Sequence, residues 1–244
     1  MVDTHAHIIT GVVDDVTEQI QRINSLTLDK IINVGLDAET NLEVLTIAQQ
    51  NSKFYAALGI HPLYIGSIDS IYQLSLTHDF SKVVALGETG LDYDTEKISI
   101  LEQTTKFIET IELANYLKLP VIVHANRMNR QALDIIRAHP PKYSFVFHCF
   151  EPDLEILDEI MKLGGYISVA SPITSPKAKK SLEVVKRVPI DRLLIEEDFP
   201  YMIRNGYDDG KNIFNRIKSL RELTHGELET ILDNNAKRLF KKLK

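Results

Sequence analysis

The sequence has little cysteine and no apolar run long enough to span a membrane. Cys149 is the single cysteine among 244 residues, so no internal disulfide can form, which suits a reducing compartment. No apolar stretch approaches the ~20 residues that a transmembrane helix needs. Asp3, His5 and His7 follow Met1 closely and leave no room for the basic and apolar regions of a secretory signal. We therefore expect a cytoplasmic protein with no membrane partner.

An excess of positive charge is also absent. The chain has 28 lysines and arginines against 34 aspartates and glutamates, a formal net charge of -6. General attraction to a polyanion is therefore not a property of the whole surface, and a phosphate-containing substrate would need a local source of positive charge. Tryptophan is absent as well, so no stacking platform for long single strands is evident. Nothing in the sequence indicates an obligate protein partner.

Short runs rich in β-branched residues alternate with longer helical stretches, which is typical of repeated βα units. The expected strands are residues 1–8, 30–35, 54–59, 83–87, 120–124, 143–148, 165–170 and 192–196. Units of roughly 30 residues fill a (β/α)8 TIM barrel of about 250 residues. We therefore expect an α/β protein with a single domain over residues 1–244. A doubly wound open sheet is the alternative, but its glycine-rich phosphate fingerprint after the first strand is missing.

Helical periodicity supports this alternation. Residues 38–50 and 96–117 both repeat apolar side chains at mostly three- and four-residue steps. Pro120 stops the second of these helices, and Gly164-Gly165 ends a third helix over residues 152–163. Each stretch is long enough to return the chain from one parallel strand to the next.

Histidines and carboxylates recur where the expected strands reach their carboxyl ends. The side chains concerned are His5, His7, His61, Glu88, His124, His148 and Asp198. In a parallel barrel all these ends meet at one rim, which is where barrel active sites form. We therefore expect residues from distant parts of the sequence to converge there.

His5 and His7 are two residues apart, so on a strand their side chains project to the same face. This pair alone is a weak signal, but the rim supplies two further imidazoles and two carboxylates: Glu88, His124, His148 and Asp198. Such a set suffices for two divalent ions bridged by a carboxylate and a water. The alternative is a group of rim side chains satisfied by hydrogen bonds alone. Mixed nitrogen and oxygen ligands suit Zn, Mn or Mg, and the sequence does not choose among them.

Several segments carry a resemblance to a known family. They are VDTHAHI, ALGIHPLYI, ALGETGLDYD, LKLPVIVHA, HCF, LLIEEDFPY and NNAKRLF, and they cover nearly the whole chain. In these motifs the chain resembles the TatD family of metal-dependent deoxyribonucleases, which are barrels of the amidohydrolase type. The resemblance implies hydrolysis of DNA and a set of metal ligands, with Glu88 bridging two ions: His5, His7, Glu88, His124, His148 and Asp198.

The sequence departs from the family pattern at positions near the rim. Asn126 stands where the family often has an arginine, and Arg127 follows one residue later. Glu151-Pro152 replaces a small Ser-Gly pair, Glu197 replaces a threonine, and Leu63 replaces a second histidine. The expected ligands are kept, whereas the positions that would face a substrate are changed.

Roles follow for the residues around the expected metals. Asp198 is the candidate to orient and deprotonate a water, the alternative being a plain ligand. His61 is expected to contact substrate phosphate or to protonate the leaving oxygen, the alternative being a capping role. Asn126 and Arg127 are candidate phosphate contacts, although Arg127 has a solvent-exposed alternative. Asp92 is expected to accept a hydrogen bond beside the site.

Three functions remain open at this point. The first is hydrolysis of DNA phosphodiester bonds from a strand end, because a barrel mouth accepts a terminus more readily than a continuous duplex. The second keeps the metals and changes the substrate to another ester or amide, for example a D-aminoacyl-tRNA or a small-molecule ester. The third is a binding module without catalysis, which the intact set of costly polar groups disfavours.

Overall fold

The computed structural model describes residues 1–95, 97–202, 207 and 210–244. In these ranges one sheet of parallel strands follows the order of the chain. The strands are Val2–Ala6 (β1), Lys30–Val34 (β2), Phe54–Leu58 (β3), Val83–Asp92 (β4), Val121–Asn126 (β5), Phe145–Phe147 (β6), Tyr166–Val169 (β7) and Leu193–Ile195 (β8). With helices between them, they form a single-domain (β/α)8 TIM barrel, as the sequence predicts.

The barrel closes between β1 and the segment that follows β8. Asp198 donates its backbone N–H to the carbonyl of His5 at 3.0 Å, and His7 donates its N–H to the carbonyl of Phe199 at 2.8 Å. Ala6 and Phe199 also form a parallel bridge. Residues from both ends of the chain therefore share one rim.

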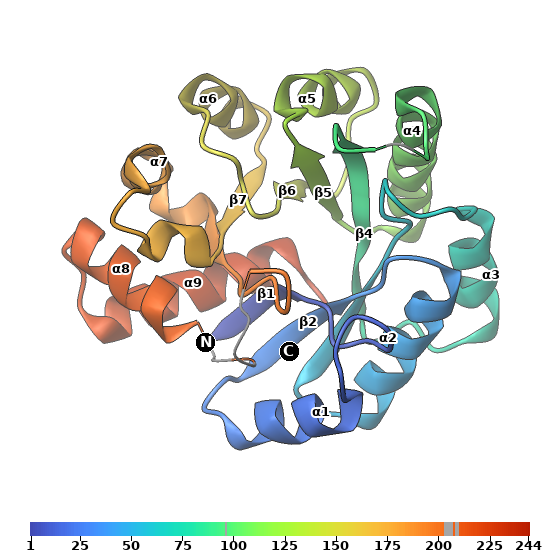
Figure 1. The fold of residues 1–244 in the computed structure, drawn as a ribbon, viewed down its shortest axis with the longest axis horizontal. Coiled ribbons are helices and arrows are strands. Elements are labelled where there is room, and N and C mark those ends of the chain that lie inside the picture. Colours follow the sequence, from blue (N-terminus) through green and yellow to red (C-terminus); the bar gives the residue numbers. More distant parts are fainter. Residues whose placement is uncertain (96, 203–206, 208–209) are drawn as a thin grey trace.

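Helices surround the strands (Figure 1). They are Val16–Ser25 (α1), Ala38–Gln50 (α2), Asp69–Thr77 (α3), Ile100–Leu117 (α4), Asn129–Ala138 (α5), Leu154–Lys162 (α6), Lys179–Arg187 (α7), Lys211–Arg221 (α8) and His225–Leu239 (α9), with short 3-10 turns at Ser171–Thr174 and Ile190–Arg192. Of the helices in the described ranges, none has the length and apolar character that a membrane crossing requires. The cytoplasmic location stays a prediction.

The inside of the barrel is apolar at the end opposite the rim. Ile32, Tyr55 and Leu194 belong to one buried cluster with Leu239 and Phe240 from the end of α9. Because side chains alternate in direction along a strand, residues that do not face the surrounding helices point into the barrel. The end of α9 therefore closes the bottom, and the polar rim is left as the open end.

One strand is longer than the sequence predicts. The expected strand over residues 83–87 continues to Asp92, because the pairing of β4 with β5 shifts between Leu86 and Thr89 and then resumes. Gly87 lies at this irregularity, and in the sequence a glycine at that position looks like the end of a strand. Glu88 therefore lies inside β4 and not after it.

Other bounds also differ from expectation. The strand expected over residues 143–148 covers only Phe145–Phe147. The helix expected over residues 96–117 begins at Ile100, because Ser99 caps it by accepting the N–H of Glu102. The expected first residue of that helix, Glu96, lies outside the described residues. The helix over residues 38–50 has the expected bounds.

Candidate active site

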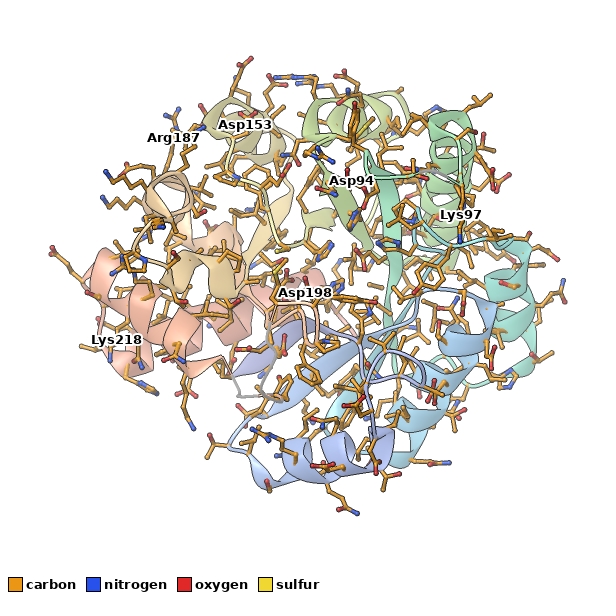
Figure 2. The ribbon with its side chains drawn as sticks, in the orientation of Figure 1. Asp94, Lys97, Asp153, Arg187, Asp198 and Lys218 are labelled. Carbon is orange, nitrogen blue, oxygen red and sulfur yellow. The ribbon has the colours of Figure 1, made fainter. Side chains whose placement is uncertain are left out.

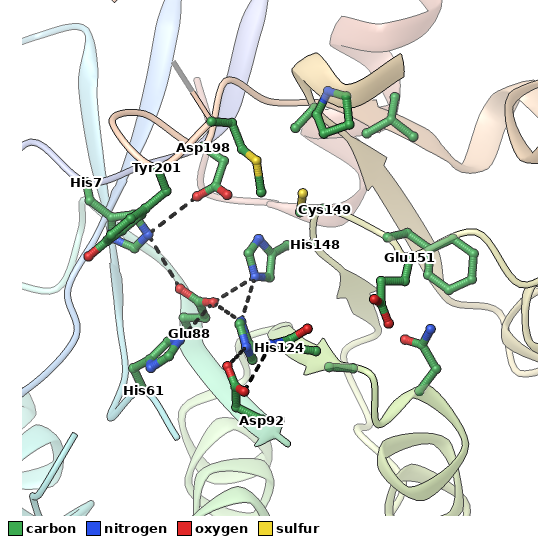
Figure 3. Close-up of a pocket in the computed structure, with 18 of the residues that line it drawn as sticks. His7, His61, Glu88, Asp92, His124, His148, Cys149, Glu151, Asp198 and Tyr201 are labelled. Atoms are coloured by element: carbon green, nitrogen blue, oxygen red, sulfur yellow. Dashed lines mark hydrogen bonds and ion pairs between the residues drawn. The ribbon is translucent and has the colours of Figure 1, made fainter. Parts of the chain in front are cut away.

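The carboxyl ends of the strands surround a cavity of about 640 Å³. It is lined by polar side chains from widely separated strands, among them His7, His61, Glu88, His124, His148 and Asp198 (Figure 3). Figure 2 shows Asp198 near the centre of the ring of strands, whereas Arg187 and Lys218 lie at its periphery. The convergence that the sequence predicts is therefore present.

The carboxylate of Glu88 stands between two pairs of imidazoles. Its Oε2 lies 3.3 Å from Nε2 of His5 and 3.5 Å from Nε2 of His7. Its Oε1 lies 2.5 Å from Nδ1 of His124 and 2.7 Å from Nε2 of His148. Glu88 is only 2% exposed. Each carboxylate oxygen thus faces a different set of imidazole nitrogen atoms.

Two glycines allow the backbone around β4 to pack this closely. Gly90 has φ +141°, and a Cβ at this position would lie 2.0 Å from the carbonyl oxygen of His124. A Cβ on Gly59 would lie 2.4 Å from the carbonyl oxygen of Glu88. A side chain at either position would push β4 away from its neighbour, so glycine is required where Glu88 approaches the imidazoles.

In the rings of His7 and His124, one nitrogen lies toward Glu88 and the other has a hydrogen-bond partner on the opposite side of the ring. If that partner accepts the ring proton, the nitrogen toward Glu88 carries a lone pair. His7 donates Nδ1–H to the carbonyl of Val34 at 2.9 Å, since a carbonyl oxygen only accepts. Nε2 of His124 lies 2.8 Å from Oδ2 of Asp92, and a ring that binds a cation through Nδ1 would donate its Nε2–H to that oxygen. Neutral His7 therefore points the lone pair of its Nε2 toward Glu88, and neutral His124 does the same with its Nδ1 when the ring proton is on Nε2.

The donor atoms of this arrangement converge on a common centre that a cation could occupy. Nδ1 of His124 and Oε1 of Glu88 are 2.5 Å apart, so a proton or another positive charge must offset the repulsion between their lone pairs. The Nε2 atoms of His5 and His7 also face each other, at 3.1 Å. Donor atoms lie within 4.8 Å of one another in three groups: His5 with Glu88 and His148, His5 with His7 and Asp198, and His61 with Asp92 and His124. The donor set fits divalent metal ions.

Without a metal ion, protons serve the same electrostatic need. Burial lowers the pKa of His148, but attraction to Glu88 outweighs it and raises that pKa well above its ordinary value. Burial raises the pKa of Glu88, but the imidazoles of His148 and His61 outweigh it and hold that pKa well below its usual range. Burial also raises the pKa of the Asp198 carboxyl to about 7. The surroundings of Glu88 therefore favour positive charge.

His61 reaches the cavity from the turn after β3. Its Nδ1 accepts the backbone N–H of Leu63 at 3.2 Å, so the neutral ring carries its proton on Nε2. That Nε2 lies 3.5 Å from Oε1 of Glu88. Burial lowers the pKa of His61, which favours the neutral ring. His61 thus presents an N–H donor to whatever occupies the cavity.

The two expected substrate contacts differ in their surroundings. Asn126 lines the cavity, and its amide donates to Oδ1 of Asp92 at 3.0 Å. Arg127 forms an ion pair with Asp94 and stacks over the ring of Tyr93 with its guanidinium carbon 4.8 Å from the centroid. Arg127 is not among the described residues that line the cavity. The expected role of Asp92 as a hydrogen-bond acceptor is confirmed.

Glu196 is a buried site residue that the sequence analysis does not single out. It accepts the N–H of Cys149 at 2.5 Å and the hydroxyl of Ser168 at 2.6 Å. Its Oε1 also lies 3.5 Å from Nδ1 of His148. The only sequence signal for Glu196 is its position directly after β8, beside Glu197 and Asp198. That position does not tell whether the carboxylate of Glu196 binds a metal ion or supports a residue that does.

Comparison with known proteins gives consistent matches over the whole chain. The model of the family described as TatD related DNase matches residues 2–241. The uncharacterized metal-dependent hydrolase YabD of Bacillus subtilis is 34% identical, with 98% of each chain covered. The uncharacterized metal-dependent hydrolase YjjV of Escherichia coli is 32% identical, with 98% of this chain and 97% of the relative covered.

Solved structures agree with these matches. The crystal structure of YjjV, a TatD homologue from Escherichia coli, superposes with a TM-score of 0.89 at 31% identity, covering 99% of this chain and 98% of the other. A TatD family hydrolase from Entamoeba histolytica superposes with a TM-score of 0.80, covering 98% and 97% of the two chains. At 21% identity, this second likeness supports the fold alone.

Proposed function

The chain belongs to the TatD family of metal-dependent hydrolases, and on that basis we propose that it hydrolyses phosphodiester bonds of DNA with two divalent ions. The observation that carries the proposal is the position of Glu88, whose two carboxylate oxygens face different sets of imidazoles. A carboxylate in that position is suited to bridge two cations. Zn, Mn or Mg would suit these ligands.

The proposed ligands divide around Glu88. His5, His7 and Asp198 would hold one ion, since their donor atoms lie within 4.8 Å of one another. His124 and His148 would hold the other, on the Oε1 side of Glu88. The bound ions would supply the local positive charge that a phosphate needs on a chain with a net charge of -6.

A pair of divalent ions there would polarise the phosphoryl oxygens and make a water acidic enough to lose its proton near neutral pH. Asp198 is the proposed acceptor of that proton, because its carboxylate lines the cavity and its Oδ1 is 3.8 Å from Nε2 of His7. His61 would donate its Nε2–H to a phosphate oxygen or to the leaving oxygen. Asn126, which lines the cavity and bonds to Asp92, would also contact the phosphate.

The size of the cavity supports cleavage from a strand end. Its volume of about 640 Å³ lies within the roughly 300–1,000 Å³ typical of small-molecule sites. The cavity therefore suits a terminal nucleotide better than a continuous duplex.

A second candidate function is favoured by the charge of the cavity wall. Among the described residues that line it there is neither lysine nor arginine, and Glu151 adds a negative charge. Apolar side chains such as Phe150, Ile173 and Met202 line much of the rest. This wall suits an ester or amide whose enclosed part carries no phosphate, for example a D-aminoacyl ester of transfer RNA or a small-molecule ester.

A substrate panel tests both candidates. Labelled DNA ends, D-aminoacyl-tRNA and small esters are incubated with Mg, Mn or Zn and the wild-type protein, His124→Ala, and the exposed control His78→Ala. The proposal expects release of nucleotides from DNA ends, lost in His124→Ala and kept in His78→Ala. Cleavage of the other esters alone would replace it with the second candidate. Full activity in excess chelator would reject both.

A further inference from the structure

One helix carries buried polar side chains on the face that packs against the barrel. Gln103, Lys106 and Thr110 of α4 are three and four residues apart, so they lie on the same face. Gln103 and Thr110 are fully buried, and Lys106 is only 5% exposed. Lysine is almost never buried unless its charge has a partner. These three residues are called the α4 polar stripe below.

Two members of the α4 polar stripe bond to β4. Gln103 accepts the backbone N–H of Asp92 at 2.8 Å and donates its amide to the Asp92 carbonyl at 3.2 Å. The hydroxyls of Thr110 and Thr89 are 3.2 Å apart. Thr89 directly follows Glu88, so the stripe contacts β4 at the backbone of Asp92 and at the residue next to Glu88.

Lys106 instead reaches the turn that carries His61. Its Nζ donates to the carbonyl oxygen of Tyr64 at 2.8 Å. The carboxylate of Glu102 is 3.9 Å away, on a side chain that is 51% exposed. Burial lowers the pKa of Lys106, because the charged ammonium group loses hydrating water inside the protein. The Tyr64 carbonyl is therefore the main partner of this ammonium group among the described residues.

The turn from His61 to Tyr64 is short and bonded within itself. Tyr64 donates its backbone N–H to the carbonyl of His61 at 2.9 Å. Leu63 donates its backbone N–H to Nδ1 of the His61 ring at 3.2 Å. A shift of Tyr64 therefore moves both the backbone and the ring of His61.

We propose that Lys106 is a positioning residue for His61. Its ammonium group holds the Tyr64 carbonyl, which fixes the turn and keeps the Nε2–H of His61 directed into the cavity. The catalytic consequence rests on the proposed function, in which His61 donates that hydrogen to the substrate. The effect on the ring itself does not depend on it.

Variants of Lys106 test the catalytic consequence. Lys106→Met removes the ammonium group and keeps the length of the side chain. We expect kcat on the best substrate of the panel to fall roughly ten- to a hundredfold, and KM and metal affinity to change by less than about twofold. Lys106→Arg keeps a cationic donor and is expected to recover most of the loss. Lys118→Met, at the exposed end of the same helix, is the matched control and should leave kcat unchanged.

A double-mutant cycle separates positioning from a general loss of stability. In a His61→Ala background, Lys106→Met should cause no further fall in kcat, because the two residues act as one unit. An equal fall in both backgrounds, or an unchanged kcat in Lys106→Met alone, would overturn the proposal. If Lys106→Met does not fold, Lys106→Gln carries the same comparison.

Nitrogen-15 NMR spectra of the imidazole rings in the metal-free protein report the position of the His61 proton and need no activity assay. The wild-type spectrum should show His61 protonated on Nε2 and unprotonated on Nδ1. In Lys106→Met both nitrogen signals should move toward the average of the two tautomers, and Lys118→Met should match the wild type. If the wild type hydrolyses nothing on the panel, the proposed function fails while this spectrum still decides the role of Lys106. Unchanged His61 signals would refute that role.

Discussion

Replacing Asp92 by asparagine should weaken metal binding although Asp92 is not among the proposed ligands. Its Oδ2 accepts Nε2–H of His124 at 2.8 Å, and its Oδ1 accepts the N–H of Asp94 at 2.7 Å and the amide of Asn126 at 3.0 Å. Asparagine has a single acceptor oxygen. If that oxygen keeps the two donors on the Oδ1 side, its NH2 group faces His124. The His124 proton then moves from Nε2 to Nδ1, the atom that faces Glu88.

The expected size of the effect follows from this change of tautomer. A ring protonated on Nδ1 cannot offer that nitrogen to a cation. Loss of a carboxylate behind a metal-binding imidazole typically costs ten- to a hundredfold in affinity, which is about 1.4–2.7 kcal/mol. Because the other proposed ligands are untouched, Asp92→Asn should still bind metal, but at higher concentration, and excess metal should restore part of its activity.

Calorimetric titration of Zn or Mn into the metal-free protein measures this directly. Asp94→Asn is the matched control, since Asp94 is exposed and pairs with Arg127 at the rim. We expect a weaker affinity in Asp92→Asn and a wild-type affinity in Asp94→Asn. Equal affinities in Asp92→Asn and the wild type would refute the reasoning that Asp92 sets the tautomer of His124.

Three further outcomes are expected. Asp198→Asn should lower kcat at least roughly a hundredfold through loss of the proton acceptor, with an unchanged circular dichroism spectrum; near wild-type turnover would contradict that role. Gly90→Ala should destabilise the fold by about 3 kcal/mol or more, because its Cβ would meet the His124 carbonyl at a strained φ; urea unfolding measures this, and a midpoint equal to that of the wild type would count against it. Arg127→Ala should change kcat/KM on DNA by less than about threefold, because Arg127 pairs with Asp94 and is not among the described residues that line the cavity; a much larger loss in steady-state assays would show that Arg127 binds substrate.

The gathering of the polar side chains could be predicted from the sequence because parallel strands bring their carboxyl ends to one rim. His5 and Asp198 are far apart in the sequence, yet the closure of the barrel makes them backbone hydrogen-bond partners. The alternation of strands and helices was enough to predict that such residues meet at one rim, although not which of them bond. The side chains that orient the imidazoles were harder to predict, because their hydrogen-bond partners depend on tertiary contacts that produce no periodic pattern in the sequence.

Three cases show where prediction from the sequence stops. The strand β4 continues past Gly87 because its register shifts against β5 and pairing then resumes. Gly87 indicates the irregularity in the sequence, but nothing local predicts that pairing resumes after it. Lys106 has a residue type typical of a solvated helix face, and only the packing of α4 against the turn at Tyr64 shows that it is buried. The pairing of Arg127 with Asp94 is likewise decided by the loops at the rim.

The central claim is that Glu88 lies between two bound cations, and anomalous diffraction from crystals soaked in Mn or Zn tests it most directly. The account predicts two anomalous peaks in the cavity, one beside His5 and His7 and one beside His124 and His148, each in contact with a different oxygen of Glu88. A single peak away from Glu88, or no peak under conditions that support hydrolysis, would contradict it.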